Sequence, residues 1–256
     1  SRFGNVSSSP KSFNNKYGVP LSLFNLNVNH DYGVFEAGMD KKGEIDRLTK
    51  IIKPDVGIIT NISYAHAKNF KNINQIALAK AEIINNIKPG GLIILNADDS
   101  FFSLHKKIAL KKNLQVLTFG MYKKANVQFR SISRNKNNFK ISVVINNKKT
   151  FFNLSTNFEN FIKNLLAVLT VISYFTDPFK LDKNIFRNFQ TPEGRGDISK
   201  IKINKKKIYL IDESYNSNPL SLKSAIQNFN MIKTHNKKYM ILGDMMELGR
   251  HSKIQH

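Results

Sequence analysis

Apolar runs bounded by turn residues alternate with segments of helical spacing in the first hundred residues. The pattern predicts a buried strand over 32–38 (YGVFEAG), a short amphipathic helix over 43–52 (GEIDRLTKII) and a strand over 55–62 (DVGIITNI). A helix over 73–87 and a strand over 92–99 follow, separated by the breaker KPGG. This alternation predicts an α/β fold with a mostly parallel central sheet and crossover helices.

Polar residues gather where the predicted strands end. Open parallel sheets bind their ligands at the carboxyl ends of their strands, so these residues are the first candidates for a functional site. They are Glu36, Asn61, His66, Asn96, Asp98 and Asp99.

The second half of the chain begins with a β-rich stretch. Four short runs joined by polar turns predict strands: QVLTFG, NVQFRSISR, NFKISVVIN and KKTFFNLS. The strongly apolar stretch over 160–175 then predicts a helix buried against the sheet.

Glycines and a proline in TPEGRGD, residues 191–197, mark the start of a second unit. A strand, a loop and a helix are predicted over 205–229, and one more strand and loop over 237–249. We therefore expect one domain over 1–191 and the start of a second, Rossmann-like α/β domain over 192–256. So few elements cannot bury both faces of a parallel sheet, so we expect the second domain to be incomplete.

Composition narrows the classes of function. The chain has 256 residues, a net charge of +22 and no cysteine, which excludes disulfides and thiolate metal sites. Its basic residues are dispersed among asparagines and isoleucines, without a zinc finger or an RNA-recognition signature, so we expect no specific nucleic-acid partner. No apolar run has the length of a membrane helix and no signal sequence opens the chain, so we expect a cytoplasmic protein without membrane insertion.

Several motifs in order resemble one family. The run GVFEAGMDKKGEIDRLTKIIKPDVGIITNISYAHAKNFKNINQIALAKAEI resembles the central ATP-binding domain of the Mur ligases, amide-forming enzymes of peptidoglycan precursor synthesis. The runs SFNNKYGVPLSL, DESYNSNPLSLKSAI and LGDMMELG resemble the members that add D-alanyl-D-alanine to UDP-N-acetylmuramoyl-tripeptide. The resemblance covers about residues 12–256. It implies ATP and Mg²⁺ as cofactors, and D-alanyl-D-alanine and UDP-N-acetylmuramoyl-tripeptide as substrates. It also implies an acyl phosphate intermediate and a monomeric protein.

The resemblance implies a metal site made of three residues. Glu36 matches the family's magnesium-binding glutamate, and His66 matches a histidine that helps hold a second magnesium. Lys80 matches a lysine that is carbamylated in many members, which turns its amine into an anionic ligand. Each residue also has a simpler interpretation: Glu36 as a solvated carboxylate, His66 as a surface histidine and Lys80 as a helix-surface lysine. Glu82 either orients this site or forms a surface pair.

The resemblance also implies nucleotide and substrate contacts. Asn164 matches the asparagine that recognises adenine, although Asn160 stands where the family usually has a histidine. Arg195 matches an arginine that contacts ATP phosphate, and Asp212 or Glu213 matches the acidic residue near the ribose. The catalytic set is thus Lys80, His66 and Arg195. The remaining candidates are Asn216 and Asn218 at the nucleotide and Asn14 and Asn15 at the UDP-muramoyl substrate, each of which could equally be a turn residue.

The sequence contains no glycine-rich loop ending in Gly-Lys-Ser or Gly-Lys-Thr, which such enzymes use to hold phosphates. In the family this loop precedes the segment NNKYGVP, so we expect it before residue 1, together with an N-terminal UDP-binding domain. We therefore interpret the chain as a fragment that is inactive by itself. Three alternatives remain open: another Mur or folylpolyglutamate-type ligase, a nonenzymatic nucleotide-binding module and, as a distant third because of the basic charge, a nucleic-acid binder.

Overall fold

The computed structural model describes residues 3–65, 67–135, 138–189, 192–204, 206–234 and 236–256. The chain forms two compact units, the first made of residues 1–62 and 66–118 and the second of residues 63–65 and 119–256. Residues 190–191, at the predicted domain boundary, lie outside the described part, and that boundary stays a prediction. Among the described residues, no helix combines the length and apolar character needed to cross a membrane.

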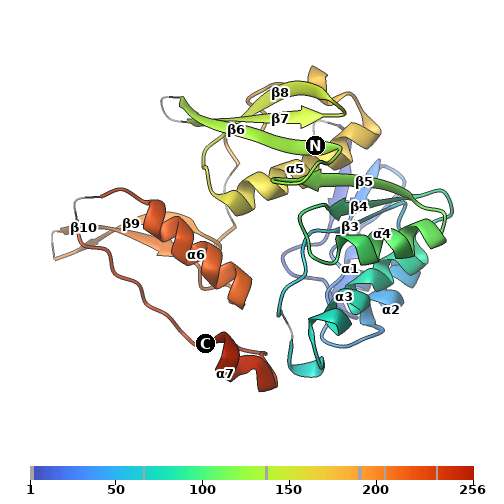
Figure 1. The fold of residues 1–256 in the computed structure, drawn as a ribbon, viewed down its shortest axis with the longest axis horizontal. Helices are drawn as coiled ribbons and strands as arrows, with labels where there is room; N and C mark the ends of the chain where they lie inside the picture. The colour runs from blue at the N-terminus through green and yellow to red at the C-terminus, as the bar shows by residue number, and fades with distance from the viewer. Residues whose placement is uncertain (1–2, 66, 136–137, 190–191, 205, 235) are drawn as a thin grey trace. The chain divides into compact units, whose positions relative to one another are not determined.

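The first unit contains the parallel strands that the sequence predicts (Figure 1). β3 (Val56–Ile59) pairs in parallel with β4 (Leu92–Asn96), and α3 (Ile73–Ala81) lies in the connection between them. α4 (Phe102–Lys111), which the sequence analysis did not predict, leads from β4 to β5 (Gln115–Gly120). Every residue of β4 is buried, as expected for a strand covered on both faces.

Local sequence signals mark the end of α2 and the start of α3. α2 (Glu44–Ile52) carries two acidic residues in its first turn and stops at Lys53, which has a left-handed conformation before Pro54. α3 begins after Asn72, whose side chain accepts a hydrogen bond from the backbone N–H of Gln75. The predicted helix over 73–87 is α-helical only to Ala81, and the chain continues as the 3₁₀ turn η2 (Glu82–Asn86).

The predicted buried strand over 32–38 is wrong in its length, its burial and the sheet to which it belongs. The strand β2 covers only Tyr32–Val34, none of its residues is buried, and it pairs in parallel with β1 (Val6–Ser8) in a separate two-stranded sheet. The chain leaves the ladder after Val34, and the backbone N–H of Gly38 bonds instead to the carbonyl of Asn14.

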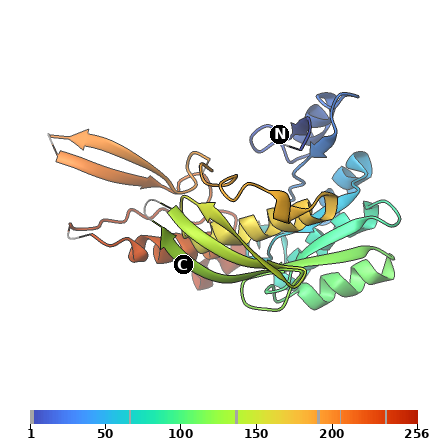
Figure 2. The ribbon, with the colours of Figure 1, turned by 90° about the horizontal axis from the view of Figure 1, so that it is seen from above.

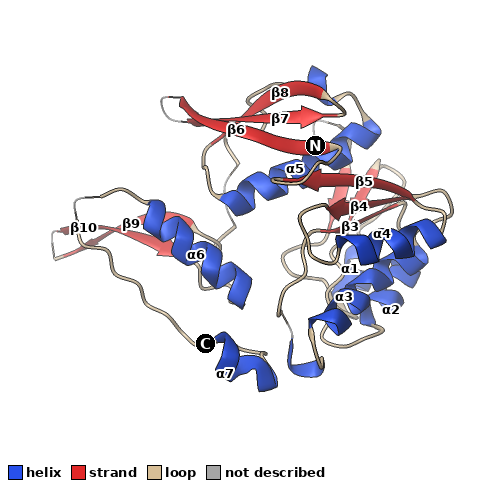
Figure 3. Cartoon of the chain, viewed as in Figure 1, coloured by secondary structure: helices blue, strands red, loops and turns tan. Residues whose placement is uncertain are grey.

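The second unit contains the predicted β-rich segment (Figure 3). β6 (Val127–Asn135), β7 (Asn138–Ile145) and β8 (Lys148–Leu154) form an antiparallel meander, and α5 (Glu159–Phe175) contacts β6. The turn between β7 and β8 places Asn146 and Asn147 at φ 46° and 68°, a conformation that asparagine tolerates well. The strand order β3-β4-β5-β6-β7-β8 makes one mixed, mostly parallel sheet, which confirms the predicted α/β class.

The last part of the chain is only partly as predicted. β9 (Asp197–Ile203) and β10 (Lys206–Asp212) form an antiparallel pair, orange in Figure 2. α6 (Pro219–Met231) follows β10 and begins after Asn218, which forms a capping box with Ser221. A further helix, α1 (Gly18–Phe24), belongs to the first unit. The strand predicted within 237–249 is wrong, because this segment pairs with no strand in the described part of the chain and Ile241 is 98% exposed. The chain ends in the short α7 (Ser252–Gln255).

Candidate functional site

Glu36 lies beside Asn14 in the first unit. The Nδ2 of Asn14 donates a hydrogen bond to Oε1 of Glu36 at 2.8 Å, and the backbone N–H of Gly38 donates to the carbonyl of Asn14 at 2.7 Å. A Cβ at Gly38 would lie 2.8 Å from Cγ of Asn14, so only glycine allows this approach. The structure thus joins two residues that the sequence analysis assigned to different ligands.

Asn15 serves the local fold. Its Oδ1 accepts hydrogen bonds from the backbone N–H groups of Tyr17 and Gly18, each at 3.0 Å. These bonds hold the turn that leads into α1, which agrees with the alternative interpretation of Asn15 as a turn residue.

Lys80 occupies the last turn of α3, between the buried residues Ala79 and Ala81. Burial of the amine lowers the pKa of Lys80 below its ordinary value of 10.5, while the negative charges of Asp99 and Glu36 act in the opposite direction. Lys80 therefore shares one electrostatic environment with two carboxylates, one near the end of β2 and one after β4. At a given pH, a larger fraction of such a lysine has a neutral amine than of a surface lysine.

Asp99 ties the ends of two parallel strands together. Its Oδ2 accepts a hydrogen bond from the backbone N–H of Ile62 at 2.8 Å, and its Oδ1 accepts one from the N–H of Phe101 at 2.8 Å. Nearby, Nδ2 of Asn96 donates to the carbonyl of Thr60 at 3.0 Å. The sequence analysis placed Asp99 at a strand end but gave it no role. The loop after β3 also contains His66, which lies outside the described residues.

His105 is a buried residue that the sequence analysis missed. It is 2% exposed, and its Nε2 lies 3.0 Å from the carbonyl oxygen of Ala77, so Nε2 carries the proton in this bond. Burial lowers the pKa of His105; the bond to Ala77 and the charge of Asp99 raise it, and the charge of Lys80 lowers it further. His105 thereby connects α4 to the helix that carries Lys80.

Glu82 forms no surface pair. It is 9% exposed and accepts hydrogen bonds from the backbone N–H groups of Gly43 and Asp46, at the beginning of α2. Of the two readings left open by the sequence, the structure excludes the surface pair.

The turn that carries Arg195 is bonded to the end of β10 in the second unit. The guanidinium of Arg195 lies over the ring of Tyr215, 4.3 Å from its centroid, and the N–H of Tyr215 bonds to the carbonyl of Gly194 at 3.0 Å. The backbone N–H of Gly196 bonds to the carbonyl of Asp212 at 2.6 Å. The turn before β9 is therefore bonded to the end of β10.

The two acidic candidates differ in their electrostatics. Hydrogen bonds from Ser214 lower the pKa of Asp212. Partial desolvation, with the charges of Asp197 and Asp212, raises the pKa of Glu213. Asp212 is thus the carboxylate that stays ionised to lower pH.

The remaining predicted residues lie in three places. Asn164 is on the exposed side of α5, and Asn216 is exposed in the loop after β10. Oδ1 of Asn218 accepts hydrogen bonds from the N–H groups of Leu220 and Ser221, so this oxygen is occupied in capping α6.

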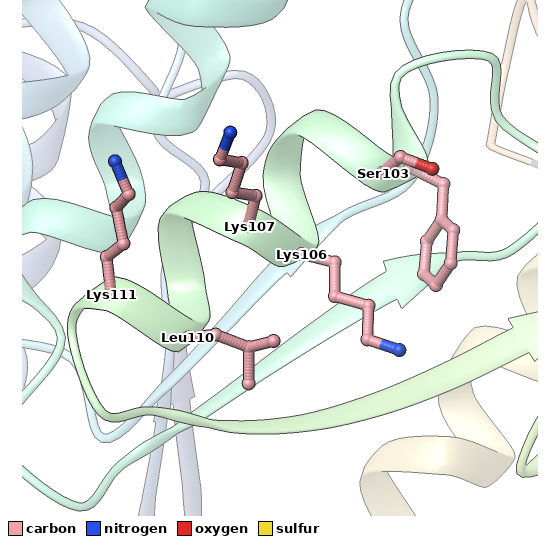
Figure 4. A pocket seen from close by; sticks show the side chains of 6 residues that line it. Ser103, Lys106, Lys107, Leu110 and Lys111 are labelled. Carbon is pink, nitrogen blue, oxygen red and sulfur yellow. The ribbon is translucent and has the colours of Figure 1, made fainter.

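A shallow hollow of about 540 Å³ lies on α4 (Figure 4). In Figure 4, Lys107 and Lys111 extend from one side of the helix, whereas Lys106 and Leu110 extend from another. None of the predicted site residues lines this hollow, which is bordered by Phe102, Ser103, Lys106, Lys107, Leu110 and Lys111. Among the described residues, no three His, Cys, Asp or Glu side chains are grouped closely enough to hold a metal ion.

Comparison with known proteins decides the family. Residues 2–172 match the model of the Mur ligase middle domain. The chain belongs to the Mur ligase family. It is 34% identical over 255 residues to the UDP-N-acetylmuramoyl-tripeptide–D-alanyl-D-alanine ligase of Buchnera aphidicola subsp. Acyrthosiphon pisum, covering 99% of this chain and 54% of that relative. The corresponding Rickettsia prowazekii ligase is 30% identical over 256 residues, covering 98% of this chain and 55% of the relative.

Solved structures of Mur ligases share the fold. A crystal structure of MurF from Acinetobacter baumannii superposes with a TM-score of 0.87 at 28% identity, covering 99% of this chain and 54% of that one. MurF from Thermotoga maritima, solved in complex with ADP, gives a TM-score of 0.83 at 24% identity, covering 99% of this chain and 57% of that one. The chain thus spans about half the length of the Mur ligases it matches.

The matched Mur ligase middle domain contains only part of the predicted site. Glu36, His66, Lys80 and Asn164 fall within residues 2–172. Arg195 and the acidic and amide residues after β10 lie beyond it. The predicted assignment to the Mur ligases is confirmed, and the individual residue roles stay predictions.

Proposed function

We propose that this chain is part of an ATP-dependent ligase that joins D-alanyl-D-alanine to UDP-N-acetylmuramoyl-tripeptide. The observation that carries the proposal is that the buried amine of Lys80 lies in the field of two fixed carboxylates, Glu36 held by Asn14 and Asp99 held by the N–H of Ile62. Ligation of a carboxylate to an amine through an acyl phosphate brings anions together, so it needs positioned cations and ionised ligands in one place. The similarity to UDP-N-acetylmuramoyl-tripeptide–D-alanyl-D-alanine ligases over nearly the whole chain supports the choice of substrates.

We assign a magnesium ion to the first unit on the donor chemistry of Glu36. Mg²⁺ prefers oxygen ligands, and the Glu36 carboxylate is exposed and fixed by Asn14. Glu36 and His66 would hold the metal, and Lys80 would contribute as a carbamate. To form it, the neutral amine attacks CO₂, a nitrogen–carbon bond forms and one proton is released; the lowered pKa of Lys80 favours this. Bound magnesium would neutralise charge on the phosphate oxygens.

In the second unit, we assign the nucleotide contacts to residues around β10 and α5. Asn164 would bind adenine through its amide, which both donates and accepts hydrogen bonds. Arg195 would bind a phosphate, and its stacking on Tyr215 supports this by fixing the guanidinium plane. Asp212 or Glu213 would bind the ribose, with Asn216 beside them. Asn218 would act by fixing where α6 begins.

Substrate contacts and molecular context complete the proposal. Asn14 and Asn15 would lie at the UDP-muramoyl substrate, Asn14 through its bond to Glu36 and Asn15 through the turn that it holds. We assign the protein to the cytoplasm as a monomer. We expect this chain by itself to be inactive, because its sequence lacks the glycine-rich phosphate loop.

The test is a ligation assay on the full-length protein encoded by the gene. Phosphate release should require ATP, Mg²⁺, UDP-N-acetylmuramoyl-tripeptide and D-alanyl-D-alanine together, and should fall at least about a hundredfold in Glu36→Gln. A panel with D-glutamate, diaminopimelate and folate substrates separates this ligase from its relatives, and preference for one of those would refute the assignment. The 256-residue chain, assayed in parallel, should release no phosphate.

A further inference from the structure

Glu82 is a buried carboxylate that connects the end of α3 to the beginning of α2. Its Oε1 accepts a hydrogen bond from the backbone N–H of Gly43 at 2.7 Å, and its Oε2 accepts one from the N–H of Asp46 at 3.2 Å. The partners are 39 and 36 residues away in the sequence. Both carboxylate oxygens are therefore used to hold another segment of the unit.

The beginning of α2 has no side-chain cap of its own. Its N-cap is Gly43, which has no side chain and has a φ of 87°. The first N–H groups of a helix lack intrahelical partners, and a negative charge beside them is stabilising. Glu82 supplies both the acceptors and the charge, so it takes the place of the missing cap.

The same 3₁₀ turn is bonded to α2 at further points. Nδ2 of Asn86 lies 3.0 Å from Oδ1 of Asp46 and 2.9 Å from Oγ1 of Thr49, and Nδ2 of Asn85 donates to Oδ1 of Asp46 at 3.2 Å. The turn that follows Lys80 is thereby attached to the first two turns of α2. Glu82 makes the bonds nearest the start of that helix.

The segment between Glu36 and α2 is held at both ends and in the middle. Asn14 bonds to Glu36 at one end, and Nδ2 of Asn69 donates to the carbonyl of Asp40 at 2.9 Å. Glu82 bonds to Gly43 at the other end. The Glu44 carboxylate also accepts hydrogen bonds from the N–H groups of Asp40 and Lys41, but these bonds lie within the segment and its own helix. Removing the Glu82 bonds would therefore take away the contact of Gly43 with the turn that follows Lys80.

We propose that Glu82 is a positioning residue that holds the Glu36 segment at a fixed place relative to the Lys80 helix. The inference rests on the proposed function, because it concerns two residues of the proposed magnesium site. Glu82 does not itself touch the metal or the substrates in this role. It acts through the backbone of Gly43 and Asp46.

Hydrogen exchange tests the contact directly. In the full-length protein, Glu82→Gln keeps one carbonyl acceptor and loses the charge, so amides over residues 40–48 should exchange about ten- to hundredfold faster. Asp55→Asn is the matched control, since it removes one carboxylate from the exposed ion pair with Lys88 in the same unit. Unchanged exchange over 40–48 in Glu82→Gln would overturn the proposal. If Glu82→Gln does not fold, Glu82→Asp keeps the charge but is too short to reach both amides, and should show the same acceleration.

Magnesium dependence tests the functional part. The magnesium concentration that gives half the maximal ligation rate should rise severalfold in Glu82→Gln and stay unchanged in Asp55→Asn. A simple loss of folded protein would lower the maximal rate without moving that concentration, and this result would overturn the positioning role.

A direct binding measurement keeps the two proposals distinguishable. If the full-length wild-type protein shows no D-alanyl-D-alanine-dependent rate, the proposed function fails. Mn²⁺ binding in the presence of ATP, followed by electron paramagnetic resonance, then decides the role of Glu82. Weaker binding in Glu82→Gln than in wild type and Asp55→Asn supports the role, and equal binding overturns it.

Discussion

The carboxylate of Asp99 accepts a hydrogen bond from the backbone N–H of Ile62 at 2.8 Å and so joins the end of β4 to the loop after β3. Its other oxygen bonds to the N–H of Phe101, one residue before α4. One side chain therefore fixes the exits of two parallel strands, beside the charge of Lys80.

Replacing Asp99 by alanine should destabilise the protein by roughly 2 kcal/mol, because two partly buried N–H groups lose a charged acceptor. Urea unfolding followed by circular dichroism measures the change. Asp55→Ala removes an exposed ion pair with Lys88 and should cost less than about 1 kcal/mol. An equal decrease in the free energy of unfolding in the two variants would show that the Asp99 hydrogen bonds stabilise the protein no more than an exposed ion pair does.

His105 should make stability depend on pH. Its pKa in the folded protein lies below the ordinary value of 6.5, so the unfolded chain binds more protons between those two values. The contribution of His105 to stability is therefore complete above 6.5 and is lost as the pH falls from 6.5 toward the folded pKa.

The comparison that isolates this effect is with His105→Gln, whose amide can still donate to the carbonyl of Ala77. The free energy of unfolding should fall more steeply in wild type than in this variant between about pH 7.5 and about pH 5. If the free energy of unfolding changes with pH in the same way in both proteins, the pKa of His105 is not lowered by folding.

The ring of Tyr215 should matter for nucleotide binding through Arg195. Tyr215→Leu removes the stacking surface, so the KM for ATP of the full-length ligase should rise about two- to fivefold, the range expected for an exposed cation–π contact. Tyr215→Phe keeps the ring and should leave KM unchanged. If both variants behave alike, the stacking does not orient Arg195 for ATP.

Local signals predicted part of the first unit. The apolar spacing and the flanking Pro54 and Gly90 defined α2, β3 and β4 to within a few residues, whereas α3 ends at Ala81 and α4 was not predicted. Pairing is not a local property, which is why the partnership of β1 with β2 was not predicted. The strand expected within 237–249 failed for the same reason, since apolar residues form a strand only where a ladder partner exists.

Candidate residues could be chosen from the sequence where a residue follows a strand or stands in an apolar helix, and their roles stay predictions. Glu36, Lys80 and Asp99 belong to this group. The bonds of Asn14 to Glu36 and of Glu82 to Gly43 cross 22 and 39 residues, so no spacing rule reveals them. His105 had a usable signal: it lies four residues before the buried Ala109, on the apolar face of the helix.

The contact between Gly38 and Asn14 limits how this family can vary. A side chain at position 38 would displace Asn14, and Glu36 would lose its amide partner. The two positions should therefore change together among homologues, with a non-glycine residue at 38 accompanied by a smaller residue at 14. Paired substitutions of this kind would mark relatives that hold their glutamate in another way.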